Sequence, residues 1–323
     1  MSAFIRQDGG PILTRNDLPD IPPAFVDATS VFNPAAAVVG GRTLLMLRIQ
    51  SRGRETGLLR AWSDDGIVFA PENELVAVRG LEKIPGTLLH LYDPRLTWVE
   101  GRLLCVLAAD TDAGCRLVTT TVDVHGDLDV IGVCDQPDVR NGVLFPERFR
   151  GHYLRLDRPN AVPLAGGPTT GDTIMLSKSE DLVAWHSVGP VFSGRPSAWD
   201  ELIGAGPPPI KTYAGWLLVY HGVATHFAGC NIYQAGAALL DLVDPTRLIA
   251  RTRRNILEPR ESWELVGQVP NVVFPSGMTA DRHDADGFVP DDAILRLYYG
   301  AADTCIGLAT TTVGDLVRAC QDD

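Results

Sequence analysis

The stretch Leu91-Tyr92-Asp93-Pro94-Arg95-Leu96-Thr97-Trp98 is followed by a turn, Glu100-Gly101-Arg102, and by a second apolar run from Leu103 to Leu107. Two short apolar runs joined by a glycine turn are typical of paired β-strands. Proline disfavours the helical region for the residue before it, so we expect Asp93 to be extended and stiffly held at the mouth of a strand. A rigidly placed acid suits proton transfer, although an aspartate at a strand entrance is often only a turn residue.

The same unit recurs along the chain. Turn residues lead into short apolar runs in five places, at 40–48, 100–107, 150–157, 214–220 and 291–299. A strand-like segment containing Asn or Pro precedes each run (206–210 before the fourth), and a strand of small residues follows it. About four strands repeated every 50 to 80 residues, roughly, are typical of a β-propeller. We therefore predict an all-β fold, a five-bladed β-propeller with an axial active-site pocket; the alternative is a pair of β-sandwiches.

The composition limits which binding partners and which cellular compartment are expected. The net charge of −12 argues against a nucleic-acid or anionic-membrane partner. No apolar run is long enough to span a membrane, and the N-terminus lacks the apolar core of a signal peptide. The six cysteines are scattered without a C-x-x-C pair, which is typical of reduced, buried thiols. We expect a cytoplasmic protein.

We expect one catalytic domain over residues 1–323, in which residues 1–30 form an arm that packs on the ring or closes it. Two segments interrupt the repeats, at 225–231 and 279–292. Acids alternate in the second segment, but their spacing does not fit a calcium-binding EF-hand loop, so we expect a solvated loop. Because no metal-ligand constellation or nucleotide-binding glycine motif is visible, we expect no metal and no cofactor. Assembly into a homo-oligomer stays open.

In a propeller, the innermost strands of all blades converge on the axis. Five polar side chains at or just beyond matching strand ends are therefore expected to meet there: Arg48, Asp93, Arg158, His221 and Asp303. Buried charges must be paired or used in function. An ion-pair network that locks the blades together would explain some of these residues, but it would not require a histidine.

Motifs along nearly the whole chain resemble glycoside hydrolase family 130. They are Asn33-Pro34, Tyr92-Asp93-Pro94-Arg95, 140–147, Asp157-Arg158-Pro159-Asn160, 204–212, 215–222, 237–241 and 298–304. This family contains inverting β-mannoside phosphorylases and related β-mannosidases. The resemblance implies a five-bladed propeller with one axial pocket. It also implies a β-mannoside oligosaccharide and inorganic phosphate as substrates, with α-mannose 1-phosphate and a shortened acceptor as products.

The resemblance further implies a role for each matching residue. Asp93 matches the family's general acid, whose proton is thought to reach the leaving oxygen through a sugar hydroxyl. The expected mannosyl-binding residues are Asn33, Arg48 and Asp303, and the expected phosphate-binding residues are Arg140, Arg158 and His221. Tyr92, Tyr233 and Phe274 match positions that line sugar subsites. The residue types fit this chemistry, because guanidinium groups bind phosphate bidentately and phosphate itself serves as the nucleophile.

One position departs from the family pattern. Leu202 stands where family phosphorylases usually carry a lysine, which removes one expected phosphate cation. The change favours an alternative, an inverting β-mannosidase in which Glu201 or Glu147 activates water. A non-catalytic propeller that binds a glycan is a third alternative. We expect the loops 225–232 and 279–292 to lie beside the pocket and to set the linkage and the acceptor, and we expect Lys211 to face solvent.

Overall fold

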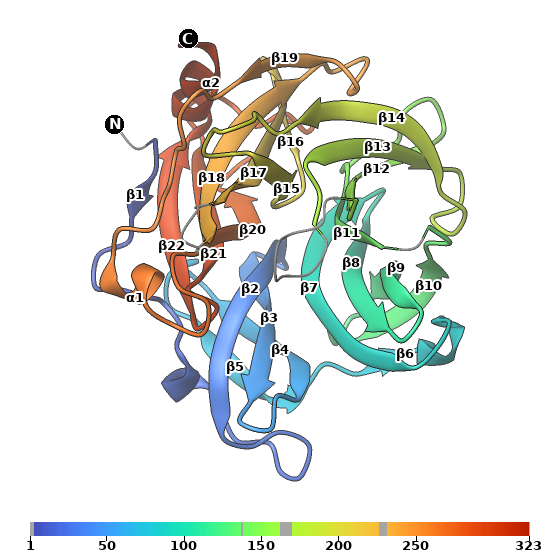
Figure 1. Cartoon of the computed structure of the whole chain (residues 1–323), viewed down its shortest axis with the longest axis vertical. Coiled ribbons are helices and arrows are strands. Elements are labelled where there is room, and N and C mark those ends of the chain that lie inside the picture. Colours follow the sequence, from blue (N-terminus) through green and yellow to red (C-terminus); the bar gives the residue numbers. More distant parts are fainter. Residues whose placement is uncertain (1–2, 137, 162–169, 226–230, 323) are drawn as a thin grey trace.

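The computed structural model describes residues 3–136, 138–161, 170–225 and 231–322. These residues form five sheets arranged around a common centre (Figure 1). The first sheet contains β2 (Ala28–Val39), β3 (Arg42–Ser51), β4 (Thr56–Ser63) and β5 (Ala70–Leu75). The second contains β6 (Val78–Arg79), β7 (Leu88–Val99), β8 (Arg102–Thr111), β9 (Gly114–Val122) and β10 (Leu128–Val133). The predicted five-bladed propeller is confirmed, and the pair of β-sandwiches is wrong.

The other three sheets follow in chain order. The third contains β11 (Val139–Leu144), β12 (Tyr153–Pro159), β13 (Thr173–Ser179) and β14 (His186–Ser193). The fourth contains β15 (Leu202–Ala205), β16 (Ile210–Thr212), β17 (Gly215–Thr225), β18 (Asn231–Leu240) and β19 (Leu248–Arg251). The fifth contains β20 (Val273–Ala280), β21 (Ile294–Ala301), β22 (Cys305–Thr312) and β1 (Ile5–Arg6). The short helices are η1 (Arg15–Asp17), η2 (Leu81–Lys83), α1 (Ser262–Leu265) and α2 (Val313–Gln321).

The fourth blade differs from the expectation in one detail. We predicted that segment 206–210 is a strand-like segment before the fourth apolar run, but β15 and β16 pair with β17 on either side of a non-strand segment, 206–209. The physical reason is that Pro207, Pro208 and Pro209 have no N–H to donate to a ladder. The inner strand is therefore interrupted beside the axis.

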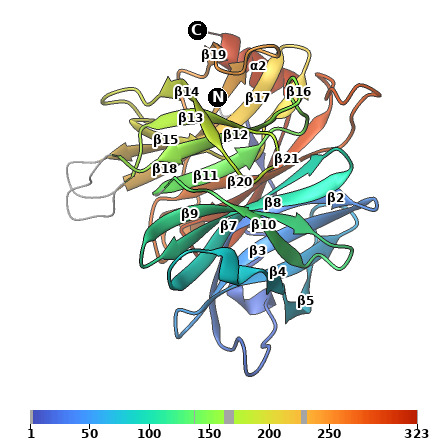
Figure 2. The same ribbon diagram turned by 90° about the vertical axis from the view of Figure 1, so that its right-hand side faces the viewer.

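Apolar side chains fill the space between neighbouring blades. One cluster joins each adjacent pair of sheets; Leu44 and Leu107 belong to the cluster between the first and second blades, and Leu47 and Leu308 to the cluster between the fifth and the first. Successive side chains of a strand point to opposite faces of the sheet, so each sheet packs one face against the preceding blade and the other face against the next. Figure 2 shows the ring from the side, with β19 near one end of the long axis and β5 near the other.

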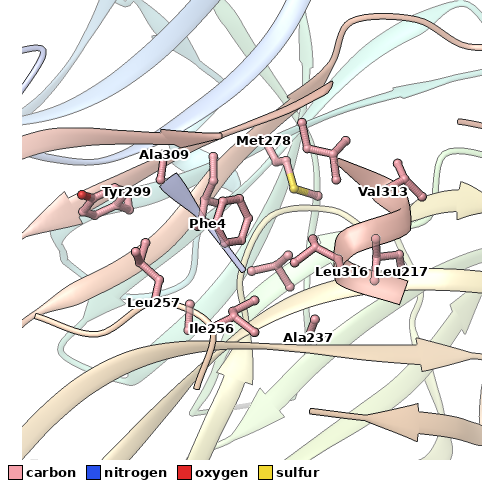
Figure 3. Close-up of a cluster of buried hydrophobic side chains, with 14 of the residues drawn as sticks. Phe4, Leu217, Ala237, Ile256, Leu257, Met278, Tyr299, Ala309, Val313 and Leu316 are labelled. Carbon is pink, nitrogen blue, oxygen red and sulfur yellow. The ribbon is translucent and has the colours of Figure 1, made fainter. Parts of the chain in front are cut away.

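The first residues add the outermost strand to the last blade. Ile5 pairs with Thr310 of β22, and Phe4 inserts its ring into the apolar cluster between the fourth and fifth blades (Figure 3). Arg6 donates two hydrogen bonds of 2.8 Å to the carboxylate of Glu264, which is fully buried and also accepts one from the Tyr299 hydroxyl at 2.8 Å. The two ends of the chain are thus joined within one sheet.

Five cysteines fall within the described residues, namely Cys105, Cys115, Cys134, Cys305 and Cys320, and all five are buried and unpaired. Cys230 lies outside the described residues. In the part of the chain that the structure describes, no helix has the length and apolar character needed to cross a membrane.

Candidate active site

A cavity of about 350 Å³ lies where the five blades converge. All ten residues predicted for the site line it: Asn33, Arg48, Tyr92, Asp93, Arg140, Arg158, His221, Tyr233, Phe274 and Asp303. They come from every blade, although they are far apart in the sequence. The convergence expected from the repeat pattern therefore brings acids and arginines from different blades into a single pocket.

The backbone of Asp93 differs from the expectation. We predicted an extended conformation, but Asp93 has a φ of 51°, in the left-handed region. The cause is a bulge in β7: Tyr92 pairs with Ala108 and Arg95 with Val106, so Asp93 and Pro94 together oppose a single residue of β8. Aspartate tolerates this region better than most residues, at a cost on the order of 1–2 kcal/mol.

Two other inner strands have the same bulge. Asn33 in β2 and Asn141 in β11 have φ values of 47° and 54°, and the strand register shifts at both positions. All three bulged residues line the pocket. Since a bulge re-aims a side chain and often lies beside a functional site, these matching Asn or Asp residues, each followed by Pro or Gly, mark the pocket end of three blades.

The Asp93 carboxylate is held from one side only. Asn33 Nδ2 and Arg48 Nη1 both donate to its Oδ1, at 2.9 and 3.0 Å. The Arg48 guanidinium carbon lies 4.4 Å from the centre of the Phe32 ring and 4.6 Å from that of Tyr92, so two aromatic rings fix its position. Because no described residue bonds Oδ2, that oxygen is left for a substrate and a proton.

Asp303 is the second acid at this end of the pocket. Burial and the neighbouring Asp93 carboxylate raise its pKa to about 6, against the opposing influence of Arg48. Like the bulged residues, it has a positive φ, of 50°. The charge of Arg48 therefore acts on both carboxylates, by a direct ion pair with Asp93 and by a charge interaction with Asp303.

Arginines gather at the other end of the pocket. Arg140 donates to Asp110 Oδ1 at 3.2 Å, and the Tyr92 hydroxyl donates to the same oxygen at 2.9 Å. Arg158 is buried and donates to Asn160 Oδ1 at 2.9 Å. Burial lowers the pKa of Arg158 to about 10, so its guanidinium stays charged at neutral pH. Both guanidinium groups keep a buried Nε without a partner in the described structure.

His221 lies beside Arg158 and is 1% exposed. Its ring centre is 4.7 Å from that of Phe274, and its Nε2 is 3.5 Å from Arg158 Nη1. Burial, assisted by the charges of Arg158 and Arg95, holds the pKa of His221 well below its usual value. The imidazole is therefore neutral at pH 7 and cannot serve as a cation. This corrects the expectation that His221 belongs to a set of positive groups.

Sequence reasoning did not single out several of the lining residues, among them the polar residues Asp110 and Asn141. Asp110 was detectable from strand geometry. Ala108 occupies in β8 the place that Arg48 and Arg158 occupy in their blades, since each is paired with the residue just before the bulge. Because side chains alternate along a strand, a residue two positions further points to the same side. Asn141 was detectable as the third Asn or Asp followed by Pro or Gly in an inner strand.

The structure also places the residues on which the hydrolase alternative depends. Leu202 is buried and lines the pocket. Glu201 and Glu147 do not line it: Glu201 accepts a hydrogen bond from Thr225, and Glu147 forms an ion pair of 2.8 Å with Lys211. Lys211 thus does not simply face solvent as predicted; only 19% of its side chain is exposed.

The expectation for one of the two pocket-side loops is wrong. Asn231 from the 225–232 segment lines the pocket, and residues 226–230 lie outside the described residues. Segment 279–292 does not line it. Phe274 lies near the start of β20, and the segment follows the other end of this strand. An extended strand of this length separates the two by roughly 20 Å. Within the described ranges, no group of three or more His, Cys, Asp or Glu side chains is placed to hold a metal ion.

The fold and the pocket define a β-propeller whose axial cavity is lined by three aspartates and three arginines. The family model described as "beta-1,4-mannooligosaccharide phosphorylase" matches residues 20–322, and the chain belongs to this family, glycoside hydrolase family 130. The resemblance seen in the sequence motifs is confirmed. The chain is thus an enzyme of the β-mannoside phosphorylase type.

Three known proteins illustrate the relationship. A beta-1,4-mannooligosaccharide phosphorylase of Ruminococcus albus is 31% identical over 97% of this chain and 89% of its own length. A 1,2-beta-oligomannan phosphorylase of a Thermoanaerobacter species is 33% identical over 90% and 92%. The solved structure of beta-1,2-mannobiose phosphorylase from Listeria innocua, in complex with beta-1,2-mannobiose, superposes with a TM-score of 0.82 at 24% identity, covering 99% of both chains.

Proposed function

We propose that the protein catalyses the inverting phosphorolysis of a β-mannoside, giving α-mannose 1-phosphate and a shortened acceptor. The observation that carries the proposal is the shared pocket of Asp93, Arg140 and Arg158. One carboxyl group with an unengaged oxygen stands in the same 350 Å³ as two guanidinium groups suited to an oxyanion. Relatives named as mannoside phosphorylases support it.

In this mechanism Asp93 is the general acid. Asn33 and Arg48 hold its Oδ1, so Oδ2 carries the proton toward the substrate. The proton passes, through a sugar hydroxyl or directly, to the glycosidic oxygen as the bond from that oxygen to mannosyl C1 breaks. Asn33, Arg48 and Asp303 bind the mannosyl ring. Holding the acid and the sugar in one rigid arrangement supplies much of the rate enhancement, because orientation is fixed before reaction.

Phosphate is the nucleophile at the other end of the pocket. Arg140 and Arg158 present guanidinium groups to it, and His221 lies beside Arg158. An oxygen of the phosphate forms a bond to C1 on the face opposite the departing acceptor, which inverts the configuration. No second carboxylate is required for this chemistry, because phosphate does not need a base to activate it.

The hydrolase alternative requires a carboxylate base near a water molecule in the pocket. Glu201 and Glu147, the two residues suggested for this role, are engaged elsewhere and do not line the pocket. Neither of these two glutamates therefore supports the hydrolase alternative, even though Leu202 replaces a cation.

Phosphorus NMR tests the proposal directly. The protein is incubated with β-1,2- and β-1,4-linked mannobiose, each with and without inorganic phosphate. We expect a new sugar-phosphate resonance that appears only with phosphate, and the productive disaccharide identifies the linkage. Asp93→Asn should abolish turnover and still bind the sugar. Release of mannose at the same rate without phosphate would establish a hydrolase instead, and wild-type inactivity on both linkages with sugar binding retained would favour a binding protein.

A further inference from the structure

A buried guanidinium group follows the proposed general acid closely in the chain. Arg95 on β7 is 1% exposed and does not line the pocket. Its Nη1 donates to the main-chain carbonyl oxygens of Asp93 and Pro94, at 3.2 and 2.9 Å. These two residues form the bulge that interrupts the ladder between β7 and β8. One side chain therefore supplies a donor to both carbonyl groups of the bulge.

The same guanidinium group also reaches two other blades. Its Nε donates at 2.8 Å to the carbonyl oxygen of Gly206, which lies where strand pairing in the fourth blade is interrupted. Its central carbon lies 5.6 Å from the centre of the Phe274 ring, which belongs to the fifth blade. The third blade separates the second from the fourth in chain order, so this contact crosses the centre of the ring. Arg95 thus sets the position of the bulge relative to blades on the other side of the pocket.

Stability alone explains this arginine poorly. In the described part of the chain no carboxylate pairs with Arg95, and its buried Nη2 has no partner. A buried charge without a counter-ion is costly, and burial lowers the pKa of Arg95. The partners that the guanidinium group does have are three main-chain carbonyl oxygens, to which it makes charge-assisted hydrogen bonds.

The other two bulges on inner strands have no arginine at the matching position. Ala35 and Val143 occupy it, and both are fully buried. The carbonyl oxygen of Pro34 accepts a hydrogen bond of 2.9 Å from the Ser276 hydroxyl, a neutral donor on the neighbouring blade. Of these three bulges, the one that carries the acid is held by a charged group of its own strand. The arrangement is therefore particular to the acid.

We infer that Arg95 is a positioning residue that acts through Asp93. The inference rests on the proposed function and adds a residue to its acid. The Asp93 carbonyl belongs to the peptide unit that follows it, so the hydrogen bond to that oxygen fixes ψ of Asp93. The bond to the Pro94 carbonyl fixes the next peptide plane, and the proline ring holds the φ between the two. Asp93 is thereby kept in its left-handed conformation, which aims the carboxyl group at the sugar.

Steady-state phosphorolysis by the wild type and Arg95→Met tests the inference. Methionine has a similar length but offers no donor to the three carbonyl oxygens. With the mannobiose that the wild type cleaves, we expect kcat to fall by at least about 100-fold, because small misplacements of a catalytic group have effects of that size. The KM values for mannobiose and phosphate should stay within about threefold, since no residue that binds them is changed. A loss carried by either KM, or an unchanged kcat, would overturn the inference.

A substrate that needs no proton separates placement of the acid from general damage to the fold. In β-mannosyl fluoride the C1–F bond breaks as a phosphate oxygen bonds to C1, and fluoride departs with the electron pair, unprotonated. A misplaced general acid matters little for such a leaving group, so Arg95→Met should stay within about tenfold of the wild type on the fluoride. Equal losses on mannobiose and on the fluoride would assign Arg95 a structural role and overturn the inference.

Two further variants complete the experiment. Arg95→Lys keeps a charged donor and should recover at least about tenfold of the kcat lost in Arg95→Met; it also carries both comparisons if the methionine variant does not fold. Arg60→Met is the control, because Arg60 is 4% exposed and pairs with Glu72 and Asp127 away from the pocket. It should lower stability and leave kcat unchanged, and a selective loss on mannobiose there would contradict the role of Arg95.

Failure of the proposed function gives a different result from failure of the inference. A wild type that forms no mannose 1-phosphate from mannobiose or from the fluoride would contradict the phosphorolysis itself. An active wild type combined with an unselective loss in Arg95→Met would contradict only the inference. If the wild type accepts mannobiose but not the fluoride, the separation of kcat from KM and the recovery in Arg95→Lys decide.

Discussion

Arg48 donates a hydrogen bond of 3.0 Å to Oδ1 of Asp93, while its guanidinium carbon lies 4.6 Å from the centre of the Tyr92 ring. The residue next to the acid in sequence thus fixes the arginine that orients the acid. Removing the guanidinium would release Asp93 from one of its two fixed contacts. In the proposed mechanism this contact sets where Oδ2 points.

Arg48→Gln should therefore lower kcat/KM for the mannoside by at least about 100-fold, because small misplacements of a catalytic group have effects of that size. The KM for phosphate should change little, since Arg48 lies at the sugar end of the pocket. Steady-state kinetics with each substrate varied in turn checks both statements. Arg52→Gln is a matched control, because the side chain of Arg52 is 82% exposed in its pair with Asp27. Equal losses in both variants would contradict the assignment.

Asp303 makes stability depend on pH in a defined direction. Its pKa in the folded protein is raised to about 6, above the ordinary value of 3.8. A raised folded pKa means that the folded state holds the proton more tightly, so the stabilising contribution is complete below about pH 4 and is lost as pH rises through about 6. Asp303→Asn lacks this titration.

Chemical denaturation of wild type and Asp303→Asn between pH 4 and pH 7 measures the effect. We expect the free energy of unfolding of the wild type to fall relative to the variant by up to about 3 kcal/mol over this range. Taking the difference between two proteins cancels other groups that titrate in both. A difference that is flat with pH, or that grows in the opposite direction, would contradict the raised pKa.

Asp110 joins the two ends of the pocket. Its Oδ1 accepts from both Tyr92 and Arg140. Burial raises the pKa of Tyr92, so the hydroxyl keeps its proton and donates it. In Asp110→Asn the amide oxygen still accepts from Tyr92, but the negative charge that competes with phosphate for Arg140 is gone.

We therefore expect Asp110→Asn to lower the KM for phosphate by about fivefold, in line with about 1 kcal/mol for a partly exposed ion pair. Asp110→Ala should raise it, because Tyr92 and Arg140 both lose their partner. Phosphate-dependent kinetics measures both changes. A KM for phosphate that falls in Asp110→Asn and rises in Asp110→Ala would show that Asp110 acts both through its charge and by positioning its partners. If the KM for phosphate changes in the same direction in both variants, Asp110 has only a structural role.

Repeat phase predicted the blade count and the convergence of five polar residues on the axis, because it determines which strand ends meet. The other five lining residues were predicted from the resemblance to the family's motifs. Neither predicted the left-handed φ of Asp93, since a bulge arises from pairing between strands rather than from the proline beside it. The placement of segment 279–292 was wrong for a related reason: a segment that interrupts the repeats can leave either end of a strand, and the end of β20 that it leaves is set by strand direction. The neutrality of His221 required knowledge of its burial.

One buried carboxylate, that of Glu264, links the first strand to the last blade. Glu264 is 0% exposed, and both its oxygens accept hydrogen bonds from Arg6 of the first strand, at 2.8 Å. The Tyr299 hydroxyl of β21 donates to it as well, at 2.8 Å. A buried ion pair that loses one partner leaves an uncompensated charge, which costs about 3–5 kcal/mol. We therefore expect Glu264→Gln, which leaves Arg6 without its counter-ion, to lower the free energy of unfolding by about that amount.

Chemical denaturation of Glu264→Gln checks this value. The nearby Glu258→Gln is the control, because Glu258 pairs through its side chain with Arg260, whose side chain is 69% exposed, and should change stability by less than about 1 kcal/mol. Because Phe4 and Arg6 lie at the start of the chain and Glu264 in the last quarter, the loss should also open the first strand. Limited proteolysis should then release an N-terminal peptide from Glu264→Gln sooner than from the control. Intact N-termini at equal rates in both proteins would show that apolar packing alone closes the ring.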